Sequence, residues 1–292
     1  MGKLGNKIRR AIRHSIYNFA PRSPYFDRLV HQLRFMQDTG GTPSTEMSFK
    51  DKIFRKLTNG SLDDVLIRAM TERDVTKTVI DGLLKRDACI GTLAVLRSHE
   101  EIDAFNFPEG AWVRTTHSYV IPELIGPTPP PVDIFHNWLA HDYYHEMREA
   151  NYKGLRPGIL VEPFMRGGAS PYLLVALCFD GDVSLFHTLE IDWASMNHAS
   201  RRFFDLEWRA LDFSVWDPIS PILRPQPSAL HAIISDCRRI AATSEIIACE
   251  LLIYPDGEYQ FFGISHCPDG GIPKIIPPDA ADEYNSRFFR LG

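Results

Sequence analysis

Apolar positions recur along the chain with two different periods, and these periods predict where helices and strands lie. Spacings of three and four residues predict helices at 49–57, 62–85, 100–105, 135–152 and 228–242. Apolar runs rich in branched residues predict strands at 90–96, 112–114, 158–161, 173–179, 183–189, 246–254 and 258–263.

Two pairs of these strands are separated by short turns. Asp180-Gly181-Asp182 precedes the strand at 183–189, and Pro255-Asp256-Gly257 precedes the strand at 258–263. Both sequences favour antiparallel hairpins, because glycine adopts the backbone conformations that tight reversals require. Helices followed by strands in hairpins predict an α+β fold rather than a doubly wound parallel sheet.

The first 26 residues differ from the rest in both pattern and charge. An apolar residue recurs every four positions, which predicts a helix with one apolar stripe: Leu4, Ile8, Ile12 and Ile16. Residues 1–26 contain six Lys or Arg and no acid, so they carry +6, and the net charge of −5 leaves −11 for the remainder. Such a helix suits an anionic membrane surface, and equally suits docking on the acidic body of its own chain. The acidic body makes nucleic acid an unsuitable partner.

Composition, the length of apolar runs and the cysteine spacing indicate what kind of protein this is. Hydrophobic residues make up 44% and charged residues 24%, as in ordinary folded proteins. No apolar run reaches the roughly 20 residues of a membrane-spanning helix, and the N-terminus lacks the apolar core of a secretory signal. The five cysteines are scattered without CxxC spacing, which favours reduced thiols. We therefore expect a cytoplasmic protein, peripheral at the inner membrane face if residues 1–26 bind lipid.

Several motifs follow one another in an order typical of one family. The central stretch NWLAHDYYHEMREANYKGLRPGILVEPFM (137–165) joins an aromatic helix, an Arg-Glu…Tyr-Lys segment and an apolar strand ending in Val-Glu. The flanking motifs, in chain order, are FKDKIFRKL (49–57), IDAFNFPEGAWVRTTHS (102–118), CFDGDVSLF (178–186), RRFFDLEWRALDF (201–213) and LIYPDGEYQFFGISHCPDGG (252–271). Together, over about 45–271, they resemble the TupA-like branch of the ATP-grasp ligases.

This resemblance implies an ATP-grasp-like fold with two α+β lobes that enclose ATP. We expect a basic amphipathic helix and linker at 1–44 and the ATP-grasp-like domain at 45–292, with lobes of roughly 45–170 and 171–292. The family joins a carboxylate to an amine through an acyl phosphate, with ATP and Mg²⁺ as cofactors, in building cell-surface polymers. Its substrates would be small molecules or polysaccharide precursors.

Seven residues fall on positions that the family uses at its site. Arg114 takes the place of a phosphate-binding lysine and keeps its charge, and His117 matches the histidine that follows. Glu162 matches the hinge residue that contacts adenine and ribose. Glu250 falls on a charged position of the penultimate strand. The resemblance implies that Glu250 and Arg114 are catalytic, and that Glu250 also binds the metal. Asp269, Gly270 and Gly271 match a glycine-rich loop and are expected to contact substrate.

Other positions depart from the family. The phosphate-loop glycines are replaced by Ser118-Tyr119-Val120, and charged positions fall on Val175, Leu252 and Ile264, which cannot bind phosphate or a hard cation. The sequence therefore supports two hypotheses, a divergent ligase and a non-catalytic descendant that binds a polysaccharide precursor or a partner enzyme. A transfer reaction on an activated sugar is a third.

The remaining candidates have weaker sequence support. His141 and His145 lie one helical turn apart, as metal ligands do, but the sequence indicates no third ligand, so a solvated helix face is favoured. Cys267 beside His266 suggests a nucleophile, against which a loop thiol is favoured. Three tryptophans are expected in the core, unless exposure makes one a platform for sugars: Trp193, Trp208 and Trp216.

Overall fold

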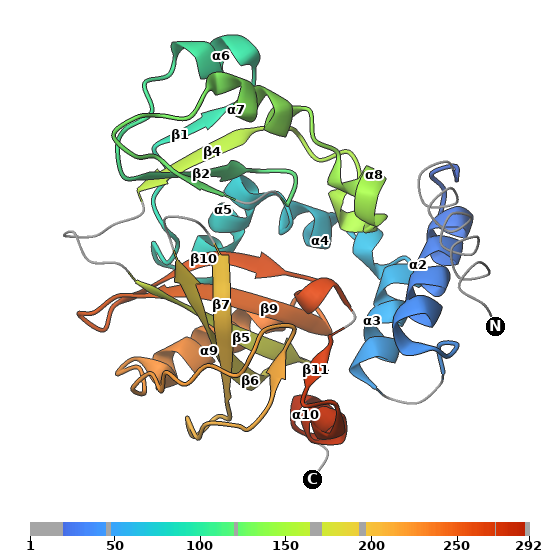
Figure 1. Ribbon diagram of the computed structural model, residues 1–292. Coiled ribbons are helices and arrows are strands. Elements are labelled where there is room, and N and C mark those ends of the chain that lie inside the picture. Colours follow the sequence, from blue (N-terminus) through green and yellow to red (C-terminus); the bar gives the residue numbers. More distant parts are fainter. Residues whose placement is uncertain are drawn as a thin grey trace.

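The computed structural model describes residues 20–44, 48–119, 122–163, 171–192, 197–271 and 273–289. Two sheet-bearing lobes lie one above the other, with two helices along one side (Figure 1). All strand pairs in both main sheets are antiparallel, so the predicted α+β class with hairpin-built sheets is confirmed. The predicted helix within 1–26 falls almost wholly outside the described residues. No helix among the described residues is long and apolar enough to cross a membrane.

The upper lobe contains a sheet with the strand order β1-β4-β2-β3. Its strands are β1 Ala94–Leu96, β2 Ala111–Thr115, β3 Glu123–Leu124 and β4 Ile159–Pro163. Side chains alternate between the two faces of a strand. Val113, Ile159 and Val161 therefore pack with the helices α6 (His99–Ala104) and α7 (Val132–Leu139). The opposite face carries Trp112, Arg114 and Glu162 toward the other lobe.

The lower lobe contains a larger sheet with the order β10-β9-β5-β6-β7. Its strands are β5 Tyr172–Phe179, β6 Asp182–Asp192, β7 Asn197–Phe204, β9 Ile246–Ile253 and β10 Tyr259–Ser265. The hairpins β5–β6 and β9–β10 match the two predicted turns, and β5 pairs with β9 to join them. β7 begins just before the aromatic segment 201–213 and extends into it. The sequence pattern predicts no strand in this region.

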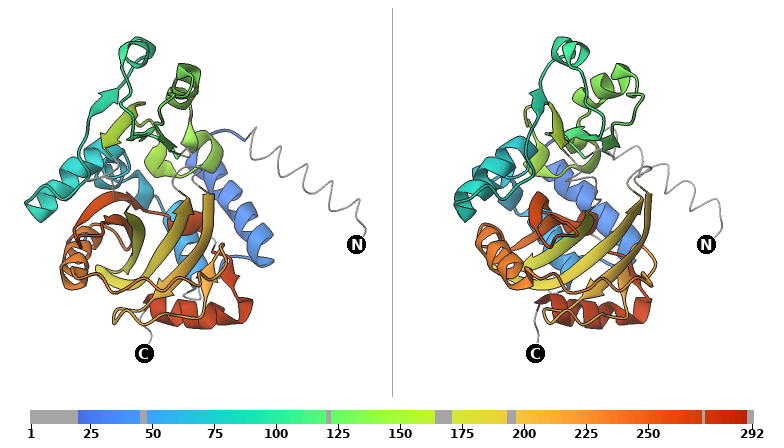
Figure 2. Two further views of the ribbon diagram at one scale, coloured as in Figure 1. Left: turned by 60° about the vertical axis from the view of Figure 1, so that its left-hand side comes forward. Right: turned by 90° about the vertical axis from the view of Figure 1, so that its left-hand side faces the viewer.

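The two faces of the larger sheet have different partners. Leu174, Ala176 and Cys178 pack with α5 (Arg73–Leu84) and α9 (Leu230–Ala241). On the other face Leu177 packs with α3 (Phe49–Thr58) and α10 (Ala281–Phe289). Figure 2 shows α9 and α10 against different sides of the curved sheet. The face that carries Leu173 and Val175 continues beyond α3 and α10, and there it is opposed by the upper lobe.

Short elements complete the fold. They are α2 Pro24–Thr39, α4 Val65–Ala69, α8 Tyr143–Met147, β8 Ser214–Val215, β11 Ile275–Ile276 and 3-10 turns at Ser61–Asp63, Ala150–Tyr152, Pro268–Gly271 and Pro278–Ala280. α2 packs beside α3 along both lobes.

Two helices predicted as continuous are broken, and side-chain caps mark where α4 and α8 begin. The segment 62–85 restarts at α4, because the Asp64 carboxylate accepts the N–H groups of Leu66 and Ile67. The segment 135–152 is interrupted after α7, where Asp142 accepts the N–H of His145 and begins α8. Arg148 then adopts a left-handed conformation with φ 60°, which ends α8. Asp favours such caps over helix interiors because its carboxylate competes for backbone N–H groups.

An ion cluster joins the two lobes. The Glu162 carboxylate on β4 is fully buried and accepts from Arg114 Nε at 2.7 Å and Nη2 at 3.1 Å, and it also pairs with Lys77 on α5. Arg114 Nη2 donates to the carbonyl of Phe262 on β10 at 2.6 Å. Lys77 Nζ also donates to the carbonyl of Ile90 at 2.8 Å. The cluster therefore connects both sheets and a helix.

We expect Glu162→Gln to destabilise the protein strongly. The amide keeps the shape but leaves Lys77 and Arg114 buried without a counter-charge, which typically costs about 3–5 kcal/mol. The free energy of unfolding in urea measures this effect. The matched control is Glu283→Gln, which breaks a half-exposed pair with Arg287 on α10. The control should change the free energy by less than about 1 kcal/mol, and equal effects of the two substitutions would contradict the role of the cluster.

Candidate functional site

A cavity of about 460 Å³ lies between the two sheets. Its floor is the apolar face of the larger sheet, with Leu173, Val175, Leu177, Leu189 and Ala248. A cavity of this size suits a small molecule. Charged and aromatic side chains stand at its two ends.

Arg114, Arg73 and Glu250 come together at one end of the cavity, from three different elements. Arg73, at the start of α5, donates through Nη1 to the carbonyl of Thr115 at 2.7 Å and also to the carbonyl of Ser118. The guanidinium of Arg114 lies on the Phe262 ring, 4.0 Å from its centre. The structure therefore brings together Arg114 and Glu250, both predicted at the site, and adds Arg73, which sequence reasoning missed.

Glu250 lies on β9, on the face that points into the cavity. Burial raises the pKa of its carboxyl, and the positive charges of Arg73 and Arg114 act in the opposite direction. Gly263 is its neighbour across the strand pair, and a Cβ there would stand 3.0 Å from Glu250 Oε2. Glycine at 263 therefore leaves room for the carboxylate. No ion pair of Glu250 is found among the described residues, so its charge faces the cavity.

Glu162 is placed differently from the sequence expectation. Its side chain is fully buried and its carboxylate is held by Lys77 and Arg114, and it is not among the residues that line the cavity. The contact with adenine and ribose that the resemblance implies stays a prediction, and this geometry does not favour it.

The charged side chains in this region do not balance. Lys77, Arg73 and Arg114 carry three positive charges and Glu162 and Glu250 carry two negative charges, which leaves one positive charge in excess.

His117 supports the backbone rather than facing the cavity. Its Nε2 lies 3.1 Å from the carbonyl of His141, and its Nδ1 accepts the N–H of Gly158 at 3.2 Å. Burial lowers the pKa of His117 to about 4. The ring is therefore neutral near pH 7 and both nitrogens are engaged, which is a poor arrangement for binding phosphate.

The opposite end of the cavity contains the predicted loop. Asp269 adopts a left-handed conformation, and its Oδ1 accepts from Arg201 Nη1 at 2.6 Å. Gly270 lines the cavity beside it, and Gly271 ends the same turn. Trp216 is about half exposed and donates through Nε1 to the carbonyl of Asp269 at 3.3 Å. The other carboxylate oxygen of Asp269, Oδ2, is buried without a hydrogen-bond partner.

Glu149 is a further cavity residue that sequence reasoning left without a role. It is buried, and burial raises the pKa of its carboxyl to about 7 although Arg34, Cys267, Tyr143 and Lys56 favour the ionised form. The Arg-Glu…Tyr-Lys motif contains this residue, and was the only sequence signal for it. Burial beside Glu149 also raises the pKa of the Cys267 thiol, so a nucleophilic thiolate is disfavoured there.

Metal chemistry has little support from the donor set. Among the described residues no three His, Cys, Asp or Glu side chains are grouped to hold a metal ion. Glu250 is the predicted metal residue, and Leu252 and Ile264 beside it are apolar. His141 lies before α8 rather than on it, so the predicted helix face shared with His145 is wrong. His141 pairs with Glu146 at 3.2 Å, and its Nδ1 contacts the hydroxyl of Ser118. A single carboxylate binds Mg²⁺ only together with other ligands, such as substrate phosphates and water.

The structure shows one tryptophan in the core and one exposed at the cavity, the two alternatives that the sequence left open. Trp208 is buried and stacks on Phe204 with ring centres 4.4 Å apart, so it belongs to the core. Trp216 is exposed at the cavity and is available to a ligand. Trp193 lies outside the described residues.

Comparisons with known proteins find structural likeness alone. No family model matches the sequence, and no curated protein matches it. An L-amino acid ligase from Bacillus licheniformis is similar at 9% identity and TM-score 0.45, over 90% of this chain and 55% of that one. The VanG D-Ala:D-Ser ligase from Enterococcus faecalis is similar at 11% identity and TM-score 0.42, over 70% and 54%.

A D-alanine–D-alanine ligase from Bacillus anthracis complexed with ATP is similar at 12% identity and TM-score 0.41, over 77% of this chain and 67% of that one. The chain thus spans little more than half the length of the first two proteins. All three are ligases by name. At these identities and TM-scores the likeness does not extend to activity, substrate or partner, and the TupA-like subtype stays a prediction.

We expect His117 to make stability depend on pH. Its pKa is about 4 in the fold against 6.5 in the unfolded chain. Unfolding below pH 6.5 therefore takes up a proton, so stability present above pH 6.5 is lost as the pH falls toward 4. In His117→Asn the amide oxygen can still accept the N–H of Gly158 and does not titrate.

The free energies of unfolding of wild type and His117→Asn should therefore converge by about 1–3 kcal/mol between pH 6.5 and 4. Denaturant titrations at half-unit steps measure both proteins. A constant difference over this range would contradict a neutral buried His117.

Proposed function

We propose that the protein binds a small anionic sugar derivative in the cavity between its sheets, as a non-catalytic descendant of an ATP-grasp enzyme. The observation that carries this proposal is the excess positive charge around Arg73 and Arg114. A partly buried charge without a partner is unfavourable, and an anionic ligand supplies the counter-charge. Arg201 at the other end is already paired with Asp269 and Asp217, so the anion belongs beside Arg73.

The sugar part of the proposed ligand is supported by Trp216. An exposed indole at a cavity edge offers a flat apolar surface, against which the C–H face of a sugar ring packs. The apolar floor of the larger sheet continues this surface. A uronic acid or a sugar phosphate combines such a ring with a negative charge, and both occur in precursors of surface polymers, which is the role that the sequence resemblance implies.

A divergent ATP-dependent ligase is the second candidate. The observation in its favour is that Glu250 and Arg114 stand around one point of the cavity without forming an ion pair. Mg²⁺ can be bound by one carboxylate together with substrate phosphates and water. In that case Glu250 would hold Mg²⁺, Arg73 and Arg114 would neutralise phosphate oxygens, and the metal would supply further charge neutralisation.

Glu250→Gln separates these two candidates. The substitution removes a negative charge from the cavity and keeps the side-chain shape. If the cavity binds an anion directly, the affinity for glucuronate without metal should rise about three- to tenfold. Calorimetric titration with glucuronate measures this, with neutral glucose as the control ligand. Unchanged or weaker binding of glucuronate by the variant would contradict the proposal.

The same pair of proteins is titrated with ATP and Mg²⁺. A ligase requires that wild type bind the nucleotide at millimolar concentration and that Glu250→Gln lose metal-dependent binding. Binding by wild type that the substitution abolishes would establish the second candidate over the first. Absence of nucleotide binding in both proteins would exclude the ligase.

Trp216→Ala should weaken glucuronate binding about fivefold or more, because the sugar loses its apolar platform. Trp216→Phe keeps a flat ring and should retain most of the affinity. Calorimetry and the melting temperature are measured for both variants, so that a loss of binding is not confused with a loss of folding. Equal affinity of wild type and Trp216→Ala would place the sugar elsewhere.

The basic segment 1–26 supports a further proposal about where in the cell the protein lies. We propose that it associates reversibly with anionic membrane, where lipid-linked precursors are found. The proposal is supported by its six cations and apolar stripe.

A further inference from the structure

α2 carries an apolar stripe on the face that points away from the body of the molecule. The helix lies on the outer side of α3, away from both sheets (Figure 1). Apolar side chains recur along it at spacings of four, four and three residues, which places them on one helix face: Tyr25, Leu29, Leu33 and Met36. Tyr25 is 75% exposed, and the other three are partly or largely exposed. None of the four belongs to the hydrophobic cores of the described residues.

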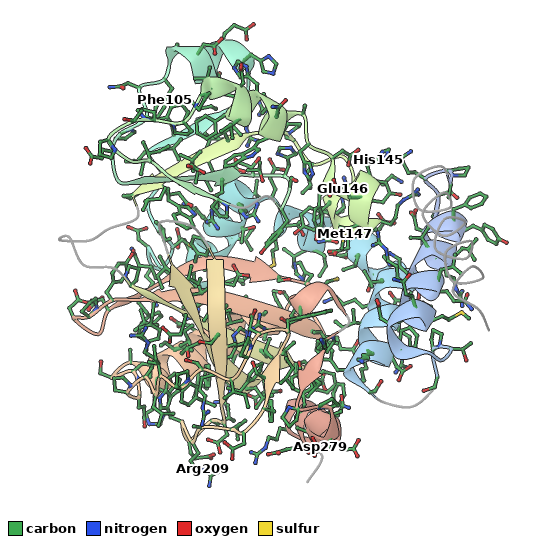
Figure 3. The ribbon with its side chains drawn as sticks, viewed as in Figure 1. Phe105, His145, Glu146, Met147, Arg209 and Asp279 are labelled. Atoms are coloured by element: carbon green, nitrogen blue, oxygen red, sulfur yellow. The ribbon has the colours of Figure 1, made fainter. Side chains whose placement is uncertain are left out.

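The opposite face of α2 attaches the helix to the body. Its buried residues are Asp27, Val30, His31 and Phe35. Arg34 donates to the carbonyls of Glu146 at 2.6 Å and Met147 at 2.9 Å. In Figure 3 His145, Glu146 and Met147 lie where α8 meets α2. Because these contacts fix one face of the helix on the body, the apolar stripe on the other face stays directed outward.

Cations border the stripe, whereas the acids of α2 are directed elsewhere. Arg22 and Arg28 are exposed, and Arg28 makes no hydrogen bond or ion pair within the described part of the chain. Asp27 is buried in an ion pair with Arg148, and Asp38 lines a cavity between α2 and α3. Residues 1–26, which lead into this helix, carry +6. The charge around the stripe is therefore complementary to anionic lipid.

The size of the stripe favours a membrane over a protein as the partner. The stretch from Tyr25 to Met36 is about 16 Å long at the rise of an α-helix, and a helix is about 10 Å wide. The stripe thus covers roughly 160 Å², far less than the ~800 Å² that each partner contributes to a stable protein–protein interface. A helix that lies on a membrane needs only one apolar stripe with cations beside it.

We propose that the outer face of α2 is the surface by which the folded body lies on an anionic membrane. The inference rests on the proposed membrane association of residues 1–26, and it adds the face of the body that meets the lipid. Tyr25, Leu29 and Met36 enter the boundary between headgroups and acyl chains, and Arg28 lies among the anionic headgroups.

This contact would fix the orientation of the molecule on the membrane. If residues 1–26 bound lipid alone, the body would hang from the short connection before α2 and could turn freely. α2 is held by α3 and α8, so a membrane contact along its outer face orients both lobes together. The cavity between the sheets then keeps a constant position relative to the lipid surface.

A fluorescent label on the outer face tests the proposal in the full-length protein. All five native cysteines are buried, so an exposed cysteine introduced by Met36→Cys can be labelled selectively with nitrobenzoxadiazole. The matched control is Ile222→Cys on a loop of the lower lobe, because Ile222 is 45% exposed and Met36 is 39% exposed. Phosphatidylglycerol vesicles should raise the emission at position 36 about twofold or more, as the dye leaves water, and leave position 222 unchanged. Phosphatidylcholine vesicles should raise neither, since they lack negative surface charge.

Co-sedimentation with the same vesicles measures the contribution of the stripe to binding. Tyr25→Ser combined with Met36→Ser should weaken partitioning into phosphatidylglycerol vesicles about tenfold, because two apolar side chains no longer enter the lipid. Ile222→Ser combined with Leu223→Ser removes two exposed apolar side chains from another surface and should change partitioning less than about twofold. Melting temperatures confirm that both double variants fold. Equal partitioning of the two double variants would overturn the proposal.

The other occupants of the stripe give different results. Pelleting without a rise at position 36 would mean that residues 1–26 bind lipid alone, which overturns the α2 contact and leaves the membrane association standing. If the wild type does not pellet, both proposals fail. High emission at position 36 without vesicles, lost on deletion of residues 1–19, would show that this segment covers the stripe. High emission that depends on protein concentration would show that a second copy covers it, and either result overturns the proposal. An equal rise at positions 36 and 222 would indicate adsorption without a defined face and overturn it too.

Discussion

The buried carboxylate of Glu162 determines how the two lobes meet. Ionising a carboxylate in an apolar interior is costly unless cations compensate, and here Lys77 and Arg114 supply them from α5 and β2. Arg114 reaches Glu162 because the two residues lie diagonally across the β2–β4 pair on one face. The same guanidinium donates to Phe262 of β10, so neutralising Glu162 also attaches the upper sheet to the lower one. The cavity adjoins this attachment, since Arg114 and Phe262 also line it.

This arrangement changes what the cleft can do. A carboxylate saturated by two cations is not available to a nucleotide, and His117 is neutral with both ring nitrogens engaged. What remains at that end is Arg73, the unpaired part of Arg114, and Glu250. Val175, at a position where the resemblance implies a charged residue, belongs instead to the apolar floor of the cavity. This floor and the small positive excess are the two features on which the proposed binding of an anionic organic molecule rests.

Much of the fold could be predicted from the sequence, because turn sequences and apolar periodicity are local signals of secondary structure. The turns at Asp180-Gly181 and Pro255-Asp256-Gly257 predicted both hairpins. The helix breaks at Asp64 and Asp142 were missed, since apolar periodicity continues through a cap that interrupts the hydrogen bonds. Contacts between residues far apart in the sequence could not be predicted, for a different reason. Lys77 and Glu162 are 85 positions apart, and nothing in either neighbourhood indicates a shared contact.

The same limit applies to the residues that line the main cavity. Arg114, Glu250, Asp269 and Gly270 do line one cavity, whereas Arg73, Glu149 and Trp216 owe their place there to tertiary packing. Packing also shapes a second cavity of about 250 Å³, which lies between α2, α3 and the end of α8. Arg148 Nη1 donates to Asp27 at 2.9 Å, the Tyr144 hydroxyl donates to the same carboxylate at 2.6 Å, and His31 Nε2 lies 3.0 Å from the carbonyl of Arg148. These contacts are buried and satisfy one another, as a network that holds a unique arrangement must. The left-handed Arg148 that ends α8 is thus also the residue that positions α2, and α2 supplies Arg34 and Phe35 to the wall of the cavity. A helix outside both lobes thereby contributes directly to a cavity that adjoins the cleft between them.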